Sequence, residues 1–467
     1  MPVARGKRAS GARQRELPFG VATNQPQPPA AAASQASAAS RASMEEWRAA
    51  PSPLPLDCDV QHYAWGQRGA GAYIPAFLGV PGAPALPYAE LWIGDNPALP
   101  SRARLSDQVE VGLPLLLATA PDVLLSAGTR AAVPARLPFL TKILAADQAL
   151  SIQVHPSASQ AQAGFAEEDA RGVPLRDERR NFKDRHHKPE LLVALTPFWG
   201  LKGFRPLAQI ASALRDEAPE LSPLGPHLDQ ELAAAGDDPR ARAAVLRALY
   251  TRAMRLPQAE VNALLEPLLA RLGRTPGLGE ADRGYWVLRA AHDHAREGAG
   301  DRGLFSFFLL NLVRLAPGQG IFLGPGEPHA YLQGVGLEVM ANSDNVLRGG
   351  LTPKHVDIER LLDILVFADG PAHVIQPASP TGVYETPAAE FQVARLELGG
   401  AMIIARDGHH GADVWVVISG GIRLAWSGGA RVLRRGVPVL VPAALGPYTL
   451  ASADGTPALA FRAGERT

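Results

Sequence analysis

The sequence of 467 residues contains a single cysteine, Cys58, so no disulfide can form within the chain. It has no net charge either, because 46 Lys and Arg residues balance 46 Asp and Glu residues. A neutral chain has no overall field that attracts nucleic acid or an anionic membrane. It also lacks any run of about 18 apolar residues, so no membrane-spanning helix is predicted. These absences predict a cytoplasmic protein that binds neither nucleic acid nor membrane.

The first 53 residues lack the hydrophobic periodicity of a packed element. Residues 30–43 read AAAASQASAASRAS, a low-complexity stretch that follows several Arg and Lys residues. A basic, Ser-rich and acid-poor segment is also typical of a transit peptide. Because this segment offers no apolar face for packing, we expect residues 1–53 to form a disordered extension.

The rest of the chain divides by its periodicity. Residues 206–300 carry apolar residues at helical spacing, as in RARAAVLRALYTRAMRL, and predict a helical insert. Short strands with Gly and Pro turns predict one β-domain from residues 54–205 and 301–370. Hairpins with Gly turns predict a second β-domain at 371–467, which loosely repeats the first without its candidate metal ligands. The predicted fold is therefore mainly β, with duplicated β-barrels and an α-helical domain.

The stretch LSIQVHP, at residues 150–156, alternates polar with apolar side chains. In a strand this alternation places Gln153 and His155 on the same face. Glu190 begins the apolar run ELLVAL, where a buried carboxylate needs a partner or a cation. His329 closes a Gly/Pro turn after another apolar strand. Two imidazoles, a carboxylate and an amide oxygen suit zinc or another divalent first-row metal.

These four candidate ligands include no cysteine. Structural zinc sites are usually closed by thiolates, whereas a set with a weak amide ligand favours an exchangeable site that also binds water or substrate. Taken singly, each of these residues is more simply explained as part of a strand or turn. Other histidines remain as competing candidates: His186, His187, His355, His409 and His410.

Several longer stretches resemble one family, the type I mannose-6-phosphate isomerases (phosphomannose isomerases). In order between residues 54 and 367, they read QHYAWG, AELWIG, LSIQVHP, HKPELLVALTPF, GEPHAYLQG and EVMANSDNVLRGGLTPKHVDI. The resemblance implies a cupin-type jelly-roll fold and one zinc ion per chain. It also implies the interconversion of mannose 6-phosphate and fructose 6-phosphate, a step that feeds GDP-mannose metabolism.

The resemblance further implies roles for single residues, and we expect a monomer whose partner is a small phosphosugar. Isomerisation moves a proton between adjacent carbons through an enediol or enediolate, whose charge a metal ion or a fixed guanidinium stabilises. The implied zinc ligands are Gln153, His155, Glu190 and His329. The implied catalytic residues are Arg348, which is essential, and Lys188 and Glu338, which are acid/base candidates. The implied sugar or phosphate contacts are Ser151, Lys142, Lys354 and Asp344.

The chain departs from the family pattern at two places. Ser157 and Ala158 follow the His-Pro pair where many relatives have Asn-Lys or Asp-Lys, and Asp95-Asn96 occupies a loop where many bacterial relatives have histidine. Neither departure touches the four ligands. Two alternatives stay open: a different metal-dependent cupin enzyme, such as an iron dioxygenase, and a sugar-phosphate-binding cupin without enzymatic activity.

Overall fold

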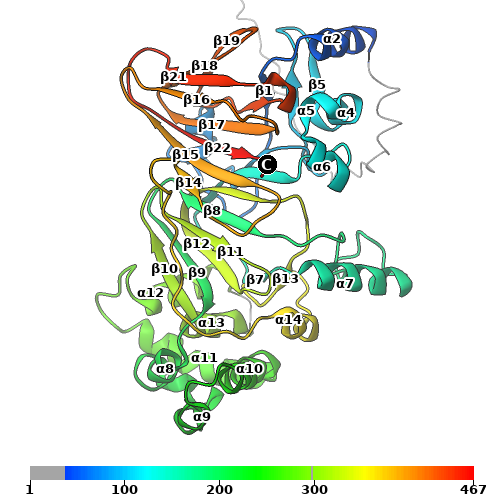
Figure 1. The fold of residues 1–467 in the computed structure, drawn as a ribbon. Helices are drawn as coiled ribbons and strands as arrows, with labels where there is room; N and C mark the ends of the chain where they lie inside the picture. The colour runs from blue at the N-terminus through cyan, green and yellow to red at the C-terminus, as the bar shows by residue number, and fades with distance from the viewer. Residues whose placement is uncertain (1–36, 296–297, 467) are drawn as a thin grey trace, which may run out of the picture.

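The computed structural model describes residues 37–295 and 298–466. These residues form three antiparallel β-sheets and a set of helices. Helices α8 to α11 gather at one end of the molecule and the C-terminal strands at the other, with the largest sheet between them (Figure 1). None of the described helices combines the length and apolar character that crossing a membrane requires.

A sheet of ten strands carries the predicted site. Six strands form its main path: β10 (Leu310–Leu315), β9 (Phe198–Phe204), β12 (His329–Ala341), β6 (Phe139–Ala146), β3 (Glu90–Ile93) and β2 (Val60–Gln61). Four more branch from it: β7 (Gln153–Val154), β8 (Glu190–Ala194), β11 (Gly320–Leu323) and β13 (Leu347–Arg348). The described residues form a mainly β fold, as predicted, and the strands pair mostly in the antiparallel direction. No sheet among them closes into a barrel, unlike the barrels expected from the sequence.

Strand β12 joins the parts of this sheet. Its first residues pair with β7 and β9, and its later residues pair with β6 and β8. The change of partners falls near Gly334, which has a φ of 121°. A Cβ at Gly334 would lie 2.6 Å from the Pro197 carbonyl oxygen, so only glycine fits there. As a result, the strands that hold the candidate ligands all meet along β12.

Successive side chains of the central strands point to opposite faces of the sheet, with apolar residues on one face and buried charged residues on the other. On β6, Ile143 belongs to a core that also contains residues of the C-terminal strands. The adjacent Lys142 points to the opposite face, as expected for a strand, and is paired in register with Glu338 on β12. Lys142 and Glu338 are both buried, at 7% and 3% exposure, so this interior has to neutralise charge.

The C-terminal region forms two further sheets. One has the order β14 (Val383–Tyr384), β15 (Gln392–Leu398), β22 (Ala458–Gly464), β17 (Asp413–Ser419), β20 (Val439–Val441), β1 (Leu54–Asp57), β4 (Arg102–Arg104) and β5 (Glu110–Gly112). The other has the order β16 (Ile403–Arg406), β21 (Tyr448–Ser452), β18 (Gly421–Trp426) and β19 (Gly429–Arg434). Strands β1, β4 and β5 thus depart from the expected boundary at residue 371. The pairing of Leu54 with Leu440 is long-range and leaves no signal in the local sequence.

Residues 38–49 form helix α2 (Ala38–Ala49), which contradicts the disorder expected for this part of the N-terminal segment. The Ser40 amide donates to the Ser37 hydroxyl and caps the helix. Met44 and Trp47, three residues apart, are each 5% exposed and belong to the same core as Leu116. Two well-placed apolar residues therefore stabilise a helix that composition alone did not indicate. Residues 1–36 of the predicted extension lie outside the described residues.

Helices fill the described part of residues 206–300, where the sequence predicts an insert. They are α8 (Leu207–Ser212), α9 (Leu228–Ala235), α10 (Pro239–Arg255), α11 (Gln258–Leu272) and α12 (Arg283–Asp293), with short turns η1 (Ala213–Glu217) and η2 (Pro219–Leu224). Tyr250 on α10 packs edge-on against Phe204 of β9, which joins the helices to the sheet.

The remaining helices lie beside the sheets. They are α3 (Tyr73–Leu78), α4 (Leu113–Thr119), α5 (Pro121–Leu124), α6 (Ala127–Ala132), α7 (Ala158–Ala170), α13 (Ser306–Leu309) and α14 (Ile358–Ile364), with turns η3 (Arg302–Phe305) and η4 (Ala443–Leu445). Helix α7 extends to one side of the ten-stranded sheet (Figure 1). Helix α14 begins after its cap, Asp357, so Lys354 lies in the preceding loop rather than at a helix start.

Candidate metal centre

Three buried side chains converge where three strands meet. His155 follows β7, Glu190 begins β8 and His329 begins β12. The two oxygens of Glu190 face the two rings: Oε1 lies 3.3 Å from His155 Nε2, and Oε2 lies 3.5 Å from His329 Nε2. Among the described residues, this is the one group of three His, Cys, Asp or Glu side chains whose possible ligand atoms lie within 4.8 Å of one another. None of the competing histidines named above belongs to such a group.

The outer nitrogens of both rings face backbone carbonyls. His155 Nδ1 lies 2.7 Å from the Asn345 oxygen, and His329 Nδ1 lies 3.0 Å from the Glu327 oxygen. A carbonyl oxygen can only accept a hydrogen bond, so each Nδ1 carries the proton and each Nε2 presents a lone pair to Glu190. Carbonyl partners of this kind orient imidazole ligands in metal sites.

His155 Nε2 is buried, and its lone pair has no hydrogen-bond donor among the described residues. Complete burial lowers the pKa of His155 to about 4, so the ring is neutral at pH 7. A neutral imidazole nitrogen facing a carboxylate oxygen sets two acceptors against each other, and a divalent cation between them would turn that repulsion into ligation. The donor set therefore fits a zinc ion.

Lys188 is the nearest cation to Glu190. Its Nζ lies 3.1 Å from Glu190 Oε1, and the side chain is buried at 6% exposure. Burial would raise the pKa of Glu190, but the Lys188 charge opposes it, and the carboxyl pKa is held well below its usual range. Glu190 is therefore ionised and available as a ligand.

A second buried group of charges lies beside the first. Lys142 Nζ is 3.4 Å from both Glu90 Oε2 and Glu338 Oε2, and it lies 4.9 Å from the Trp92 ring centroid. Burial would lower the pKa of Lys142, but the two carboxylates outweigh it and raise that pKa above its usual value. The Tyr331 hydroxyl donates to Glu338 Oε1 at 2.8 Å. Burial, followed by the charge of Glu190, raises the pKa of Glu338.

Two cations near the ligands lack a carboxylate partner. Arg348 pairs in backbone register with Gln153, and its half-buried guanidinium forms no ion pair with a described residue. Burial lowers the pKa of Arg348. Lys354 is only partly exposed, and the burial of part of its side chain, followed by the charge of Arg348, lowers its pKa. Two neighbouring cations without carboxylates are suited to an anionic ligand.

The remaining predicted residues lie around this region. Gln153 is half-buried and pairs in backbone register with His329 as well as with Arg348. Ser151 is half-buried two residues before it. Asp344 is exposed, and its Oδ1 accepts a hydrogen bond of 3.4 Å from Asn96 Nδ2.

Comparison with known proteins gives a consistent result. Residues 54–207 match the family model described as phosphomannose isomerase type I, catalytic domain. The chain is 38% identical to the mannose-6-phosphate isomerase of Shigella flexneri over 314 residues, which cover 67% of this chain and 75% of that protein. It is 33% identical to the mannose-6-phosphate isomerase of Mus musculus, with coverage of 75% and 83%.

The chain belongs to the type I phosphomannose isomerase family.

Solved structures of the family agree with this assignment. The structure of mannose 6-phosphate isomerase from Salmonella typhimurium bound to fructose 6-phosphate and zinc has a TM-score of 0.76 and 32% sequence identity, and covers 89% of this chain and 100% of that chain. A zinc-bound mannose 6-phosphate isomerase gives the same values. The resemblance inferred from the sequence motifs is thereby confirmed, together with the mainly β fold.

Some residues of this family member's site were missed by sequence reasoning. Glu90 and Trp92 alternate within the motif AELWIG, which could have placed both on one face of a strand. Tyr331 lies two residues after His329, and the same period indicates the interior. Their partners could not be foreseen, because the contact of Glu90 with Lys142 depends on the register between β3 and β6.

Proposed function

We propose that this chain is a zinc-dependent aldose–ketose isomerase that interconverts D-mannose 6-phosphate and D-fructose 6-phosphate. One observation carries the proposal. His155 Nε2, buried and without a hydrogen-bond partner in the described part of the chain, faces Glu190 beside His329. This arrangement occurs in a chain that is 38% identical to a curated mannose-6-phosphate isomerase.

Four residues would hold one zinc ion per chain: Gln153, His155, Glu190 and His329. The amide of Gln153 is the fourth ligand in this proposal because its strand pairs with the first residue of β12, His329. When bound, zinc supplies a Lewis acid that polarises and orients the sugar oxygens. His155 and His329 are already held in the required tautomer by backbone carbonyls.

The phosphate and the developing charge of the sugar would be met by different cations. We assign Lys354, with Ser151, to the phosphate, because Lys354 is exposed and carries no carboxylate partner among the described residues. Arg348 lies deeper and nearer the ligand strand, so we assign it to the negative charge of the enediolate. Asp344, exposed near Asn96, would contact a sugar hydroxyl.

Proton transfer between the two sugar carbons requires a group that can accept and return a proton. Glu338 and Lys188 are the candidates, and Glu338 has the more suitable environment. Burial and the charge of Glu190 raise the pKa of Glu338, and a higher pKa makes a carboxylate a stronger general base. Lys142 and Tyr331 both contact Glu338, so they hold its carboxylate in place. This division makes Lys142 an orienting group inside the pocket rather than a phosphate ligand.

Three broader expectations belong to the same proposal. The sheets around β12 and the C-terminal sheets would represent two copies of a cupin-type jelly-roll, of which one holds the metal. The chain would be cytoplasmic. It would also act as a monomer, because all four proposed ligands come from a single chain. Size-exclusion chromatography with light scattering tests the oligomeric state.

Turnover separates this proposal from a binding protein without activity. The purified chain is incubated with fructose 6-phosphate, and mannose 6-phosphate is measured by a coupled assay. We expect steady formation of mannose 6-phosphate by the wild type and a loss of about three orders of magnitude in Arg348→Ala, because a fixed charge next to the reacting carbons is removed. Binding of fructose 6-phosphate without any turnover would overturn the proposal.

A further inference from the structure

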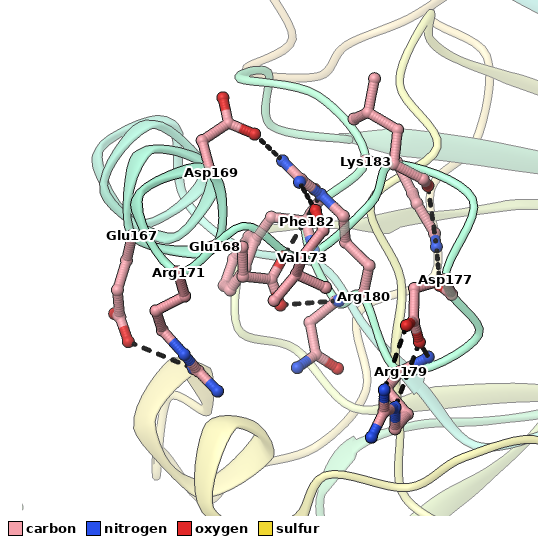
Figure 2. Close-up of polar contacts among 12 residues, drawn as sticks. Glu167, Glu168, Asp169, Arg171, Val173, Asp177, Arg179, Arg180, Phe182 and Lys183 are labelled. Carbon is pink, nitrogen blue, oxygen red and sulfur yellow. Dashed lines mark hydrogen bonds and ion pairs between the residues drawn. The ribbon is translucent and has the colours of Figure 1, made fainter.

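The loop between α7 and β8 leads to Lys188 and Glu190 at the metal centre. Two groups of polar contacts hold this loop in place, and we call each group a fastening. The first lies near α7 and centres on Arg180, which is 4% exposed (Figure 2). The Arg180 guanidinium donates to Asp169 Oδ1 at 2.7 Å and to the carbonyls of Val173 and Phe182. Glu168 lies 3.6 Å from it. This fastening holds the first half of the loop to the helix.

The second fastening lies nearer the metal centre and joins Asp184 to Asn345. Asn345 is fully buried, and its Oδ1 accepts hydrogen bonds from the amides of Lys183 at 2.6 Å and Asp184 at 3.2 Å. Its Nδ2 donates to the carbonyl of Asp184 at 2.9 Å and to that of His186 at 2.8 Å. Both polar atoms of the Asn345 side chain therefore form hydrogen bonds with the loop.

Asp184, on the loop, forms hydrogen bonds in the opposite direction, to the turn that contains Asn345. Its carboxylate accepts hydrogen bonds from Ser343 Oγ at 2.9 Å, from the Asp344 amide at 2.8 Å and from the His186 amide at 2.8 Å. The side chain thus ties the Ser343–Asn345 turn to the loop four residues before Lys188. Sequence reasoning missed Asp184, because its partners lie about 160 residues away in the chain.

The same Asn345 also touches a candidate metal ligand. Its backbone carbonyl is the acceptor for His155 Nδ1 at 2.7 Å. Asn345 therefore orients the His155 ring through its backbone carbonyl. Its side chain holds the loop segment that leads to Lys188 and Glu190. A shift of the loop would move Glu190 relative to the ring that Asn345 holds.

We propose that Asp184 and Asn345 form a positioning pair that sets the distance between His155 and Glu190 and so fixes the affinity of the metal centre. The inference rests on the proposed function only in taking this centre to bind a divalent metal. Asp184 touches neither ligand, so it acts through Asn345 and the loop. The Arg180 fastening, by contrast, stabilises the loop without setting the ligand geometry.

Three variants separate positioning from general stability. Asp184→Ala removes the carboxylate of the pair. Asp177→Ala is the matched control, because it lies in the same loop and removes the same charge, and among the described residues the Asp177 carboxylate accepts hydrogen bonds from Arg179 alone (Figure 2). Arg180→Ala loosens the first half of the loop and leaves the pair intact. For each protein, zinc affinity is measured by competition with a chromophoric chelator, and Co²⁺ absorption spectra report the ligand geometry.

We expect Asp184→Ala to weaken zinc binding by about 10- to 100-fold, as losses of outer partners of metal ligands do, and to shift the Co²⁺ bands. Asp177→Ala should match the wild type, and Arg180→Ala should lower the melting temperature of the metal-free protein while keeping the wild-type zinc affinity. Wild-type affinity and spectrum in Asp184→Ala would overturn the proposal, as would an equal loss in Arg180→Ala.

A conservative variant keeps the proposal testable if Asp184→Ala does not fold. Asp184→Asn preserves the size of the side chain and one acceptor oxygen, so we expect a zinc affinity between those of the wild type and the alanine variant. Asp184→Asn with unchanged affinity and an unchanged Co²⁺ spectrum would contradict a positioning role. A wild-type protein that binds no zinc at all would instead contradict the proposed function, which keeps the two failures distinct.

Discussion

Two fully buried carboxylates in this molecule are neutralised in different ways. In the C-terminal sheets, Asp413 lies 2.8 Å from an Arg462 guanidinium nitrogen, accepts a 2.8 Å hydrogen bond from the Tyr448 hydroxyl and lies 3.2 Å from His409 Nδ1. In the ten-stranded sheet, Glu190 faces one ammonium and two imidazole nitrogens that carry lone pairs. The Arg462 guanidinium balances the charge of Asp413 in the first group. The second group is rich in acceptors, and we propose that a metal cation balances it.

The comparison shows why we treat one buried histidine as structural and propose another as a metal ligand. The ring nitrogens of His409 face the Asp413 carboxylate and the Pro442 carbonyl, and Arg462 supplies the balancing charge. His155 Nδ1 faces a backbone carbonyl, whereas its Nε2 has no hydrogen-bond partner among residues 37–295 and 298–466. Burial next to a carboxylate is therefore not a sign of a metal site unless the donors of the protein fail to satisfy the acceptors.

The largest effect should come from removing one of the imidazole ligands. We expect His329→Ala to lose bound zinc and to lower kcat/KM by at least about 10³-fold, because several kcal/mol of metal stabilisation disappear. His409→Ala is the matched control, since it removes a buried histidine beside a buried carboxylate. That control should keep its zinc and most of its activity while losing stability. Elemental analysis and the coupled assay check both, and equal zinc loss in the two variants would break the comparison.

The opposite pattern is expected when the C-terminal group is broken. Asp413→Asn leaves Arg462 buried, at 3% exposure, without its charge partner. Breaking one side of a buried ion pair costs about 3–5 kcal/mol of unfolding free energy. Denaturant unfolding should show that loss, while the zinc content of the folded protein stays at the wild-type value. A stable Asp413→Asn protein would mean that this network contributes less than its geometry indicates.

A smaller effect is expected from removing Lys354, a cation that, unlike Arg462, forms no ion pair with a described residue. Arg462 has a carboxylate, whereas Lys354 has none among the described residues and is assigned to the substrate phosphate. Lys354→Ala should remove one charge-assisted hydrogen bond of about 1.5–3 kcal/mol, which is about a 10- to 150-fold loss in kcat/KM for mannose 6-phosphate. Weak turnover of unphosphorylated mannose should barely change. Equal losses for both sugars would place Lys354 at the reacting carbons instead.

The smallest expected effect is a pH dependence of stability. Burial would raise the pKa of Asp413, but Arg462 and His409 outweigh it, and that pKa is held far below its usual value. The unfolded carboxyl has a pKa of about 3.9, so the unfolded state takes up the proton first as the pH falls. The stability that Asp413 contributes is thus present above about pH 4 and lost below it, by at most about 1.4 kcal/mol per pH unit. Urea unfolding between pH 3 and 7 should be less pH-dependent in Asp413→Asn than in the wild type.

Local sequence pattern could indicate the candidate metal ligands because these residues lie in strands or at strand ends. The alternation of Gln153 and His155 and the position of Glu190 before an apolar run are local signals, and the motif around Arg348 identified the family. The contacts that support these residues are not local. Lys142 could not be matched with Glu90 and Glu338, because that requires the register of β6 with two other strands. The Asp184–Asn345 pair is equally long-range.

The fold was predictable in class but not in its borders. Helical periodicity located α10 and α11 within the predicted insert. The packing of Trp47 into the core was missed because the Ala and Ser residues around it are typical of disordered segments. The core residues that stabilise this helix, such as Leu116, lie far away in the sequence. Likewise, the pairing of β1 with β20 is set by packing at the far end of the chain. Tertiary contacts override local composition at both places.

The proposed isomerase activity requires one zinc ion at the His155, Glu190 and His329 group. The most direct test strips the protein with a chelator, returns Zn²⁺ stepwise, and measures bound zinc and the rate of isomerisation of fructose 6-phosphate at each step. We expect almost no rate in the stripped protein and a linear rise that ends at one zinc per chain, with no rise in His329→Ala. Full activity in protein shown to be metal-free by elemental analysis would contradict the account.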